Sequence, residues 1–345
     1  MANVAVLGAG AVGLSTALCV QQGVPGVRVT VIADKFTVDT TSDGAAGIIA
    51  PMHDLVRTKT YEEIRKYIED SFAWYDSLCK SAEGPEAGIQ RISGYDLLPE
   101  REQLPLLRDI LYQFRELTEK ELDSFPDDVR YGWFYTTLMV ECRRYLPWLM
   151  RRFRDNGGML ITKYINALND IPCDYDVVVN CLGLGSREVF NDPETYPIRG
   201  HVLRVKAPWM KHFMRVARGP GTEAYVFPGQ DNVVLGGTYE KNEYDTQNYK
   251  TEIFDQIVDR VAKYVPGMKY APIERRWVGL RPCRSELRVE KESYNINGQT
   301  IKVVHNYGHG HQGILLSWGT ALRATELVKE CLSGGSHRQH TKSKL

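Results

Sequence analysis

Val4-Ala5-Val6-Leu7-Gly8-Ala9-Gly10-Ala11-Val12-Gly13-Leu14-Ser15 is the stretch that decides the fold of this chain. An apolar, β-branched run ends at Gly8-x-Gly10-x-x-Gly13, and an alanine-rich helical stretch follows over 15–21. A second apolar run, 27–33, ends at Asp34, 21 positions after Gly13. Strand, glycine turn, helix, strand and acidic residue, in this order and spacing, predict a dinucleotide-binding βαβ unit.

The three glycines have different roles in such a unit. Gly8 permits the tight turn, Gly10 lets a pyrophosphate approach the backbone, and Gly13 lets helix and strand pack closely. The N-terminus of the helix offers free amides and the positive end of its dipole to the diphosphate. A glycine pattern alone is weak, and a glycine-rich turn of an unrelated α/β protein is the alternative. The two strands and the acidic residue favour the nucleotide site.

Length and composition exclude several classes of protein. With 345 residues the chain is long enough for two domains. Its 43 basic and 43 acidic residues give no overall field for nucleic acid or an acidic membrane. No apolar run reaches the about 18 residues that span a bilayer. Because no basic start precedes the first apolar run, we expect no signal peptide and a chain on the reducing side of the secretory membrane.

The cysteines and the last residues indicate where the chain works. Seven cysteines are scattered without a Cys-x-x-Cys pair, so we expect neither a disulfide framework nor a metal site. The final Ser343-Lys344-Leu345 matches the peroxisomal address that is read at a free C-terminus. The residues before it are polar and glycine-rich, as an accessible tail should be. We therefore expect a flexible tail over 334–345 that binds a peroxisomal import receptor, and a location in the peroxisome matrix.

A second glycine-rich turn lies about 300 residues after the first. The apolar run 301–305 leads into a loop over 306–313, which contains Gly308, Gly310 and Gly313, and a helix is expected over 314–332. Two loops of this kind suit a flavin. The first loop takes the diphosphate, and the dipole of the last helix stabilises negative charge on the reduced isoalloxazine ring. A glycine-rich loop that merely closes the fold is the alternative.

Hydrophobic periodicity between the two loops predicts an α/β chain with two excursions. Helices are expected over 60–82, 105–114, 118–124, 141–155 and 251–264, and strands over 90–98, 159–162, 175–183, 201–205, 225–227, 233–235 and 275–280. The predicted fold class is a discontinuous Rossmann-like FAD-binding domain plus a mixed, largely antiparallel α+β substrate domain. The first is expected to comprise 1–55, 140–195 and 282–333, and the second 56–139 and 196–281.

Along nearly its whole length the chain resembles the D-amino-acid oxidase and D-aspartate oxidase family of peroxisomal FAD enzymes. The resemblance rests on 7–19, 40–47, 92–95, 145–149, 179–181 and 207–209, together with Gly279-Leu280-Arg281-Pro282 and His305-Asn306-Tyr307-Gly308-His309-Gly310. The last two in combination are specific to this family.

The resemblance also implies a set of site residues. It places FAD against Gly8, Ala9, Gly10, Val12, Gly13, Asp34, Lys35, Thr41, Ser42, Ala46, Gly47, Ile48, Ile165, Gly183, Gly310, Gly313, Ile314 and Leu315. Arg281 resembles the arginine that clamps the substrate α-carboxylate, a role that suits a planar guanidinium. Tyr225 matches the tyrosine whose hydroxyl helps to hold the same carboxylate. A buried ion pair for Arg281 and a core position for Tyr225 are the structural alternatives.

The chemistry implied by the resemblance asks little of the protein in proton transfer. A D-amino acid binds with its amine deprotonated, hydride passes to flavin N5, and water hydrolyses the imino acid to a 2-oxo acid and ammonia. Oxygen then reoxidises the flavin and gives hydrogen peroxide. Because the protein supplies orientation and electrostatics, no catalytic acid or base is expected. His305 and His309 are interpreted as structural.

The choice between acidic and neutral D-amino acids depends on a second cation. The chain is closer to the aspartate branch, in which a substrate-facing arginine lies on a mobile loop just before the position of Tyr225. Arg215 and Arg218 are the candidates, although either could be a surface charge. Two departures oppose this prediction: Tyr239 stands where aspartate oxidases usually show arginine, and His311 stands where a small residue is usual. When protonated, His311 could help to bind an acidic side chain.

We therefore expect oxidative deamination of D-aspartate and D-glutamate, with neutral D-amino acids as the alternative. A nicotinamide dehydrogenase and a catalytically inactive FAD-binding protein are readings from other classes. The expected partners are a small D-amino acid, oxygen and the import receptor. Nucleic acid and membrane are not expected, and a homo-oligomer is possible.

Overall fold

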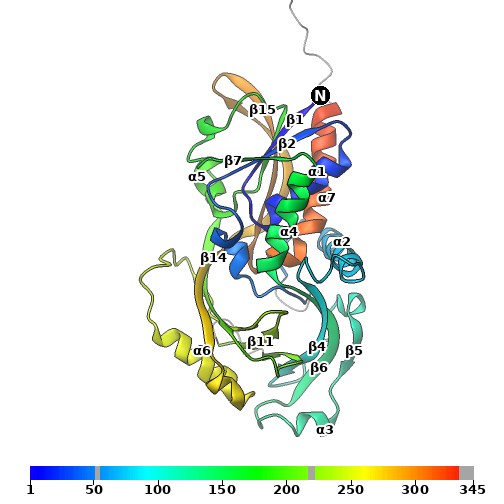
Figure 1. The fold of residues 1–345 in the computed structure, drawn as a ribbon, viewed down its shortest axis with the longest axis vertical. Coiled ribbons are helices and arrows are strands. Elements are labelled where there is room, and N and C mark those ends of the chain that lie inside the picture. Colours follow the sequence, from blue (N-terminus) through cyan, green and yellow to red (C-terminus); the bar gives the residue numbers. More distant parts are fainter. Residues whose placement is uncertain (51–54, 217–221, 334–345) are drawn as a thin grey trace, which may run out of the picture.

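The fold is built on one large β-sheet with helices packed against it (Figure 1). The computed structural model describes residues 1–50, 55–216 and 222–333. Its strands are β1 (Asn3–Leu7), β2 (Arg28–Ala33), β3 (Ile48–Ile49), β4 (Ile89–Leu98), β5 (Tyr112–Glu116), β6 (Tyr131–Val140), β7 (Met159–Thr162), β8 (Val177–Asn180), β9 (Tyr196–Val205), β10 (Phe213–Val216), β11 (Ala224–Pro228), β12 (Val233–Gly236), β13 (Glu240–Lys241), β14 (Ile273–Ile296) and β15 (Gln299–His309).

Within the described residues these strands join into one 15-stranded sheet. Its path is β3-β6-β4-β10-β11-β12-β9-β14-β15-β8-β1-β2-β7, with β13 beside β9 and β5 beside β6. The α-helices are α1 (Ala11–Gly23), α2 (Tyr61–Cys79), α3 (Glu119–Leu122), α4 (Cys142–Asp155), α5 (Ser186–Val189), α6 (Glu252–Ala262) and α7 (Gly313–Ser333). Short 3₁₀ turns include Thr41–Gly44, Gly183–Gly185 and Gly310–Gln312.

The βαβ unit expected at the N-terminus is confirmed. β1 and β2, which precede and follow α1 in the chain, are adjacent parallel strands. β8, β15 and β7 extend the parallel region. Every residue of β8 is buried, which explains the three consecutive valines that precede Asn180. Because these strands are parallel, their carboxyl ends lie at one edge of the sheet, here called the cofactor edge.

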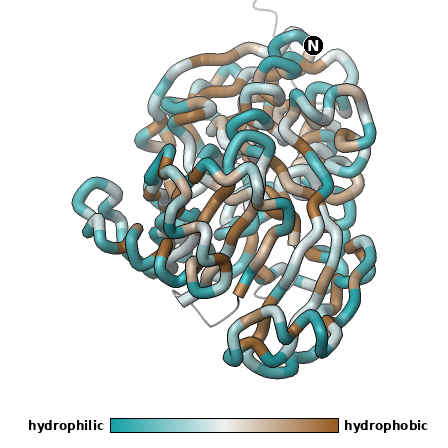
Figure 2. Tube along the Cα trace, turned by 60° about the horizontal axis from the view of Figure 1, so that its bottom comes forward, coloured by the Kyte–Doolittle hydropathy of each residue, from teal (hydrophilic) through white to brown (hydrophobic). Residues whose placement is uncertain are grey.

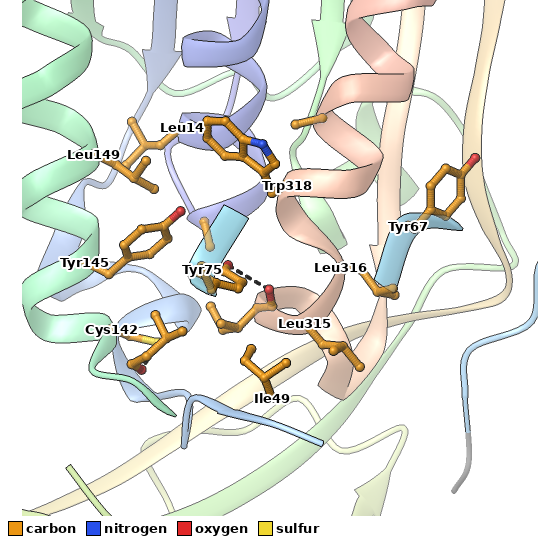
Figure 3. Packing of buried hydrophobic residues seen from close by; sticks show 14 of the residues in the cluster. Leu14, Ile49, Tyr67, Tyr75, Cys142, Tyr145, Leu149, Leu315, Leu316 and Trp318 are labelled. Atoms are coloured by element: carbon orange, nitrogen blue, oxygen red, sulfur yellow. Dashed lines mark hydrogen bonds between the residues drawn. The ribbon is translucent and has the colours of Figure 1, made fainter. Parts of the chain in front are cut away.

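Helices α1, α2, α4 and α7 pack beside the parallel region as one hydrophobic core (Figures 1 and 3). Figure 3 shows Tyr75 of α2 and Tyr145 of α4 beside leucines of α1 and α7. Tyr75 donates a hydrogen bond to the Ile314 carbonyl (2.9 Å) at the start of α7. Trp74 and Trp318 stack with ring centroids 3.5 Å apart. The start of α7 is therefore fixed by its neighbours as well as by its own turn.

The second half of the sheet is mainly antiparallel, and alternation along its strands gives it two different faces. Leu203, Val226 and Leu235 pack under α6, on what is here called the outer face. Val202 and Tyr225 project to the opposite, inner face and join the core of the rest of the molecule. β14 pairs with both β9 and β15 and so connects the two halves (Figure 1).

One predicted helix is wrong. Residues 105–114 contain a 3₁₀ turn, Arg108–Ile110, and the start of β5. Tyr112 packs on Phe72, and Phe114 packs on Trp133 and Tyr135. Two aromatic side chains two positions apart fit one face of an edge strand on β6, and this tertiary contact overrides the local helical pattern.

Other elements match with different limits. The helix predicted over 118–124 is the short α3, which begins with a capping box of Thr118 and Glu121. The predicted loop over 306–313 is only partly a loop, because β15 continues to His309 beside β14 and is followed by the Gly310–Gln312 turn. A 3₁₀ turn, and not an open loop, thus leads into α7.

The predicted fold class is confirmed by this mixed α/β architecture, while the domain limits stay a prediction. The limit expected between 281 and 282 lies inside β14. Figure 2 shows hydrophobic segments along the interior strands and helices, and hydrophilic segments in the peripheral loops. In the part of the chain that the structure describes, no helix has the length and apolar character needed to cross a membrane.

Candidate active site

The cofactor edge brings together most of the residues that the sequence predicted to contact FAD. β1 ends before Gly8, β2 before Asp34 and β15 before Gly310. Gly183 follows β8, and Ile165 follows β7. Since the strands are parallel, their loops converge at the place where open α/β sheets bind nucleotides.

The first glycine turn is compact for the steric reasons that the motif implies. Gly8 has φ +100°, and a Cβ there would lie 2.5 Å from the Cys181 carbonyl oxygen. A Cβ on Gly13 would overlap the carbonyl oxygen of Gly8, so only glycine lets α1 pack this closely on the end of β1. Gly10 is the N-cap of α1. The first amides of a helix lack partners within it, so they are available to groups that approach this turn.

A second segment approaches the same helix end. The Ser42 hydroxyl accepts a hydrogen bond from the Ala11 amide (3.0 Å), which joins the Thr41–Gly44 turn to the N-terminus of α1. Ala46, Gly47 and Ile48 follow in the chain. Gly47 has φ +81°, and a Cβ on it would overlap the Val140 carbonyl oxygen at the end of β6. The segment predicted to face the flavin ring, 46–48, is thus held between the N-terminus of α1 and the end of β6.

A buried ionic cluster that no sequence motif predicted holds the Thr41–Gly44 turn against β9 and β14. Arg204 of β9 donates to Glu141 Oε1 (2.8 Å) and to the Asp43 carbonyl oxygen (3.1 Å). Arg275 of β14 donates to Asp43 Oδ2 (2.7 Å), and Arg143 Nε lies 3.7 Å from Asp43 Oδ1. Burial raises the pKa of Glu141, and Arg204 opposes this effect. The one sequence feature that could have indicated this cluster is Arg204, a charged residue within the apolar strand predicted over 201–205.

Arg281 lies on the inner face of β14, opposite Ile198 of β9. Its guanidinium covers Gly200, where any Cβ would overlap it. Nη1 donates to the Thr238 carbonyl oxygen (3.0 Å). Among the described residues no carboxylate forms an ion pair with Arg281, whereas Arg204 and Arg284 each have one at 2.8 Å. The half-buried charge of Arg281 is therefore not balanced by any carboxylate of the described residues.

Tyr225 lies beside this guanidinium. It is 8% exposed, stacks on Phe227 and pairs across β11 and β12 with Gly236. Burial raises the pKa of Tyr225 to about 12, and the nearby charge of Arg281 opposes that rise. The tyrosine hydroxyl is thus neutral at physiological pH, a hydrogen-bond donor next to a cation.

One candidate for the second cation lies elsewhere than expected. Arg215 was expected on a mobile loop, but it lies on β10, directly opposite Tyr225. Its guanidinium makes two hydrogen bonds to the buried Asp96 carboxylate (3.1 and 2.7 Å). Strand pairing and this carboxylate therefore hold it in place. Arg218 lies outside the described residues.

His311 is exposed at the turn before α7, where its Nε2 lies 3.3 Å from Gln312 Nε2. The two other histidines of this region are buried. His305 is 3.1 Å from Asn180 Nδ2, and His309 is 3.0 Å from the Thr320 hydroxyl. Burial lowers the pKa of His305 to about 4 and that of His309 to about 3. Both rings are neutral parts of the fold.

Comparison with known proteins identifies the family. The family described as "FAD dependent oxidoreductase" (DAO) matches residues 3–327. The chain belongs to this family. It is 41% identical to the D-aspartate oxidase of Homo sapiens, over 96% of each chain. It is 31% identical to the D-amino acid oxidase of Dugesia ryukyuensis, over 96% of this chain and 98% of that one.

The fold agrees with solved structures of more distant proteins. Glycine oxidase from Bacillus cereus has a TM-score of 0.75 at 18% identity, covering 96% of this chain and 95% of that chain. The chain is thus an FAD-dependent oxidoreductase. Its residues fit FAD, because the absence of side chains at Gly8 and Gly13 brings the N-terminus of α1 to the cofactor edge, and the Ser42 hydroxyl joins a second segment to that helix end.

The cysteines and the other metal-ligating side chains can be checked directly in the described residues. All seven cysteines are free. No group of three or more His, Cys, Asp or Glu side chains that could hold a metal lies within the described ranges.

Proposed function

We propose that this chain oxidises D-amino acids to 2-oxo acids, ammonia and hydrogen peroxide, and that it prefers D-aspartate and D-glutamate. The observation that carries the proposal is the Arg281 guanidinium, which has no carboxylate partner among the described residues and lies beside the Tyr225 hydroxyl. An arginine fork binds a carboxylate through two parallel hydrogen bonds. A substrate α-carboxylate supplies the missing anion.

Arg281 and Tyr225 fix the substrate by one end. Tyr225 donates a hydrogen bond from a hydroxyl that stays protonated, since its pKa is raised to about 12. Bound FAD supplies the acceptor for the hydride that leaves the substrate α-carbon. The chain itself supplies orientation and a half-buried site in which charge interactions are stronger than in water. The neutral, buried His305 and His309 take no part in proton transfer.

Support for acidic substrates comes from the relatives and from the charges around the inner face. D-Aspartate oxidases of Homo sapiens and Caenorhabditis elegans are 41% and 34% identical to this chain. The side-chain carboxylate of D-aspartate or D-glutamate needs a second cation, in addition to the Arg281 that binds the α-carboxylate. Because Asp96 already balances Arg215, the proposal assigns this role to Arg218, with a contribution from His311 when it is protonated.

Neutral D-amino acids are the second candidate, and a specific position favours them. Tyr239 follows Thr238, whose carbonyl oxygen accepts from Arg281, and it occupies the place where aspartate oxidases usually show arginine. Relatives named as D-amino acid oxidases cover the chain just as fully, at 31–33% identity.

The proposed place of work is the peroxisome matrix, reached through an import receptor that binds Ser343-Lys344-Leu345. An enzyme that releases hydrogen peroxide fits a compartment that destroys it. Deletion of the last three residues should leave the activity unchanged and move a fluorescent fusion out of peroxisomes. Peroxisomal import of the shortened chain would refute this address.

A peroxide assay of the purified flavoprotein tests the function. Turnover of D-aspartate and D-glutamate should exceed that of D-alanine, and N-methyl-D-aspartate should also be oxidised. Fast turnover of D-alanine with none of D-aspartate would establish the neutral alternative. Arg281→Ala should abolish turnover and retain the yellow flavin. Loss of the flavin from this variant would give Arg281 a structural role instead.

A further inference from the structure

One short segment supports both residues of the proposed carboxylate site. Gly236, Gly237 and Thr238 connect β12 to β13 along β9. A Cβ on Gly236 would overlap the Tyr225 ring, and one on Gly237 would lie 2.7 Å from the Tyr225 hydroxyl. The Thr238 carbonyl oxygen accepts the hydrogen bond of Arg281. A shift of this segment therefore moves the supports of both side chains together.

Arg260 holds the segment from the other side. It belongs to α6, which packs on the outer face, and its Nη2 donates to the Gly237 carbonyl oxygen (2.8 Å). The Arg260 Nε is buried and has no hydrogen-bond partner among the described residues. Glu223 and Tyr225 also act on its charge. A hydrogen bond from a charged donor is stronger than one from a neutral donor, so Arg260 restrains the Gly237 carbonyl strongly.

His201 holds the next residue. It is fully buried on β9, between the rings of Tyr249 and Phe254. Its backbone amide donates to the Thr238 hydroxyl (3.0 Å), and its Nδ1 lies 2.8 Å from the same oxygen. Its Nε2 is buried with no partner among the described residues. The ring therefore contacts Thr238 through one nitrogen and leaves its other nitrogen unpaired, which is uncommon for a buried polar group.

The two contacts reach the segment from the face opposite to the substrate. His201 packs against Phe254 of α6, whereas its neighbour Gly200 lies under the Arg281 guanidinium on the inner face. Arg260 comes from α6 itself. Neither side chain needs to touch the substrate to affect its binding.

We propose that Arg260 and His201 are positioning residues, which fix the Gly236–Thr238 segment from the outer face and thereby hold Arg281 and Tyr225 ready for a carboxylate. The inference rests on the proposed function, because it assumes that these two residues bind the substrate carboxylate. Donors that are already held in position bind an anion more tightly, because binding then costs no further loss of side-chain conformational entropy.

Malonate, a dicarboxylate without an oxidisable amine, serves as the probe, and its dissociation constant is read from the change in flavin absorbance of the holoenzyme. Arg260→Met should raise this constant about tenfold, as expected for the loss of a charged hydrogen bond. Arg260→Lys should raise it about threefold, since one donor remains. The KM for D-aspartate should rise in parallel, and kcat should stay within about threefold.

Arg276→Met is the matched control. Arg276 is exposed, and its guanidinium lies 5.9 Å from the Phe254 ring centroid on the same α6 side. This variant should bind malonate like the wild type. Thr238→Val should weaken malonate binding, because it removes the hydroxyl that His201 holds, whereas Thr238→Ser should not. If Arg260→Met does not fold, this threonine pair decides the outcome.

Malonate affinities of Arg260→Met and Thr238→Val equal to those of their controls would overturn the inference. Arg281→Met separates this failure from failure of the proposed function. Loss of malonate binding in Arg281→Met together with wild-type binding in the other two leaves the function intact and removes the positioning role. Retention of malonate binding by Arg281→Met refutes the carboxylate site itself.

Discussion

The cofactor edge and the inner face of the antiparallel strands are held together by different interactions. At the cofactor edge, glycines let backbone meet backbone, as where Gly13 lies against the Gly8 carbonyl. On the inner face, arginines meet buried carboxylates, as in Arg204 with Glu141 and Arg215 with Asp96. The first kind of contact is steric and needs only the absence of a side chain, whereas the second is electrostatic and needs two particular side chains that lie far apart in the chain. Five changes test this difference.

Arg204→Met should have the largest effect, about 4 kcal/mol of unfolding free energy, because it leaves Glu141 buried without its cation. It also removes the donor to the Asp43 carbonyl, so FAD should dissociate more readily. Urea unfolding and flavin release measure the two effects. Arg151→Met, which breaks an exposed pair with Glu86, should change neither by a comparable amount. A loss below about 1 kcal/mol for Arg204→Met would mean that packing holds the segment.

Gly13→Ala should destabilise the fold by about 3 kcal/mol, because its Cβ overlaps a backbone oxygen that cannot move without displacing α1 from β1. FAD binding should be lost with it. Gly157→Ala is the control, since Gly157 has φ +84° and nothing lies within 4 Å of its Cβ. Backbone strain alone should cost about 1 kcal/mol there. Equal losses for the two variants would remove the steric explanation of the turn.

Arg215→Met should cost about 2 kcal/mol, less than Arg204→Met because the Arg215 side chain is 25% exposed. If Asp96 fully occupies this arginine, the ratio of D-aspartate to D-alanine turnover should change less than about threefold. Peroxide assays on both substrates measure the ratio. A fall of tenfold or more would show that Arg215 reaches the substrate side chain.

Acidification should lower the free energy of unfolding, because His309 is buried in its neutral form. The pKa of His309 is lowered by burial to about 3, whereas in the unfolded chain it is about 6.5. Below pH 6.5 the unfolded chain therefore binds a proton that the folded chain does not, and stability falls by about 1.4 kcal/mol per pH unit. His309→Gln should lose less stability than the wild type between pH 6.5 and 4.5 in urea titrations. Parallel curves would contradict this prediction.

Glu326→Gln should have the smallest effect, below about 0.5 kcal/mol. It breaks the pair with Arg323, which is 2.9 Å long but 40% and 63% exposed at its two side chains. Thermal unfolding measures it. A change of 2 kcal/mol would show that surface charges stabilise this protein as much as the buried pairs do.

The same difference explains which parts of the site could be predicted. Gly8, Gly10 and Gly13 could be recognised because their spacing within one βαβ unit is itself the motif. Asp96 and Glu141 could not, because their partners lie 119 and 63 positions away. The helix predicted over 105–114 failed for a related reason. Its aromatic residues pack on α2 and β6, and no local pattern reports such a contact.

The sequence by itself determined the nucleotide turn, the fold class, the cofactor and the family, because these follow from local steric requirements and from motifs that few folds share. Only the tertiary structure decided that Arg215 is bound to Asp96 and that Arg281 lacks a carboxylate partner among the described residues. It also decided that the Gly236–Thr238 segment contacts Arg281 and Tyr225 on one side and Arg260 on the other. These are properties of charge pairing across the sheet. They exist only when strands from distant parts of the chain bring their side chains to the same face.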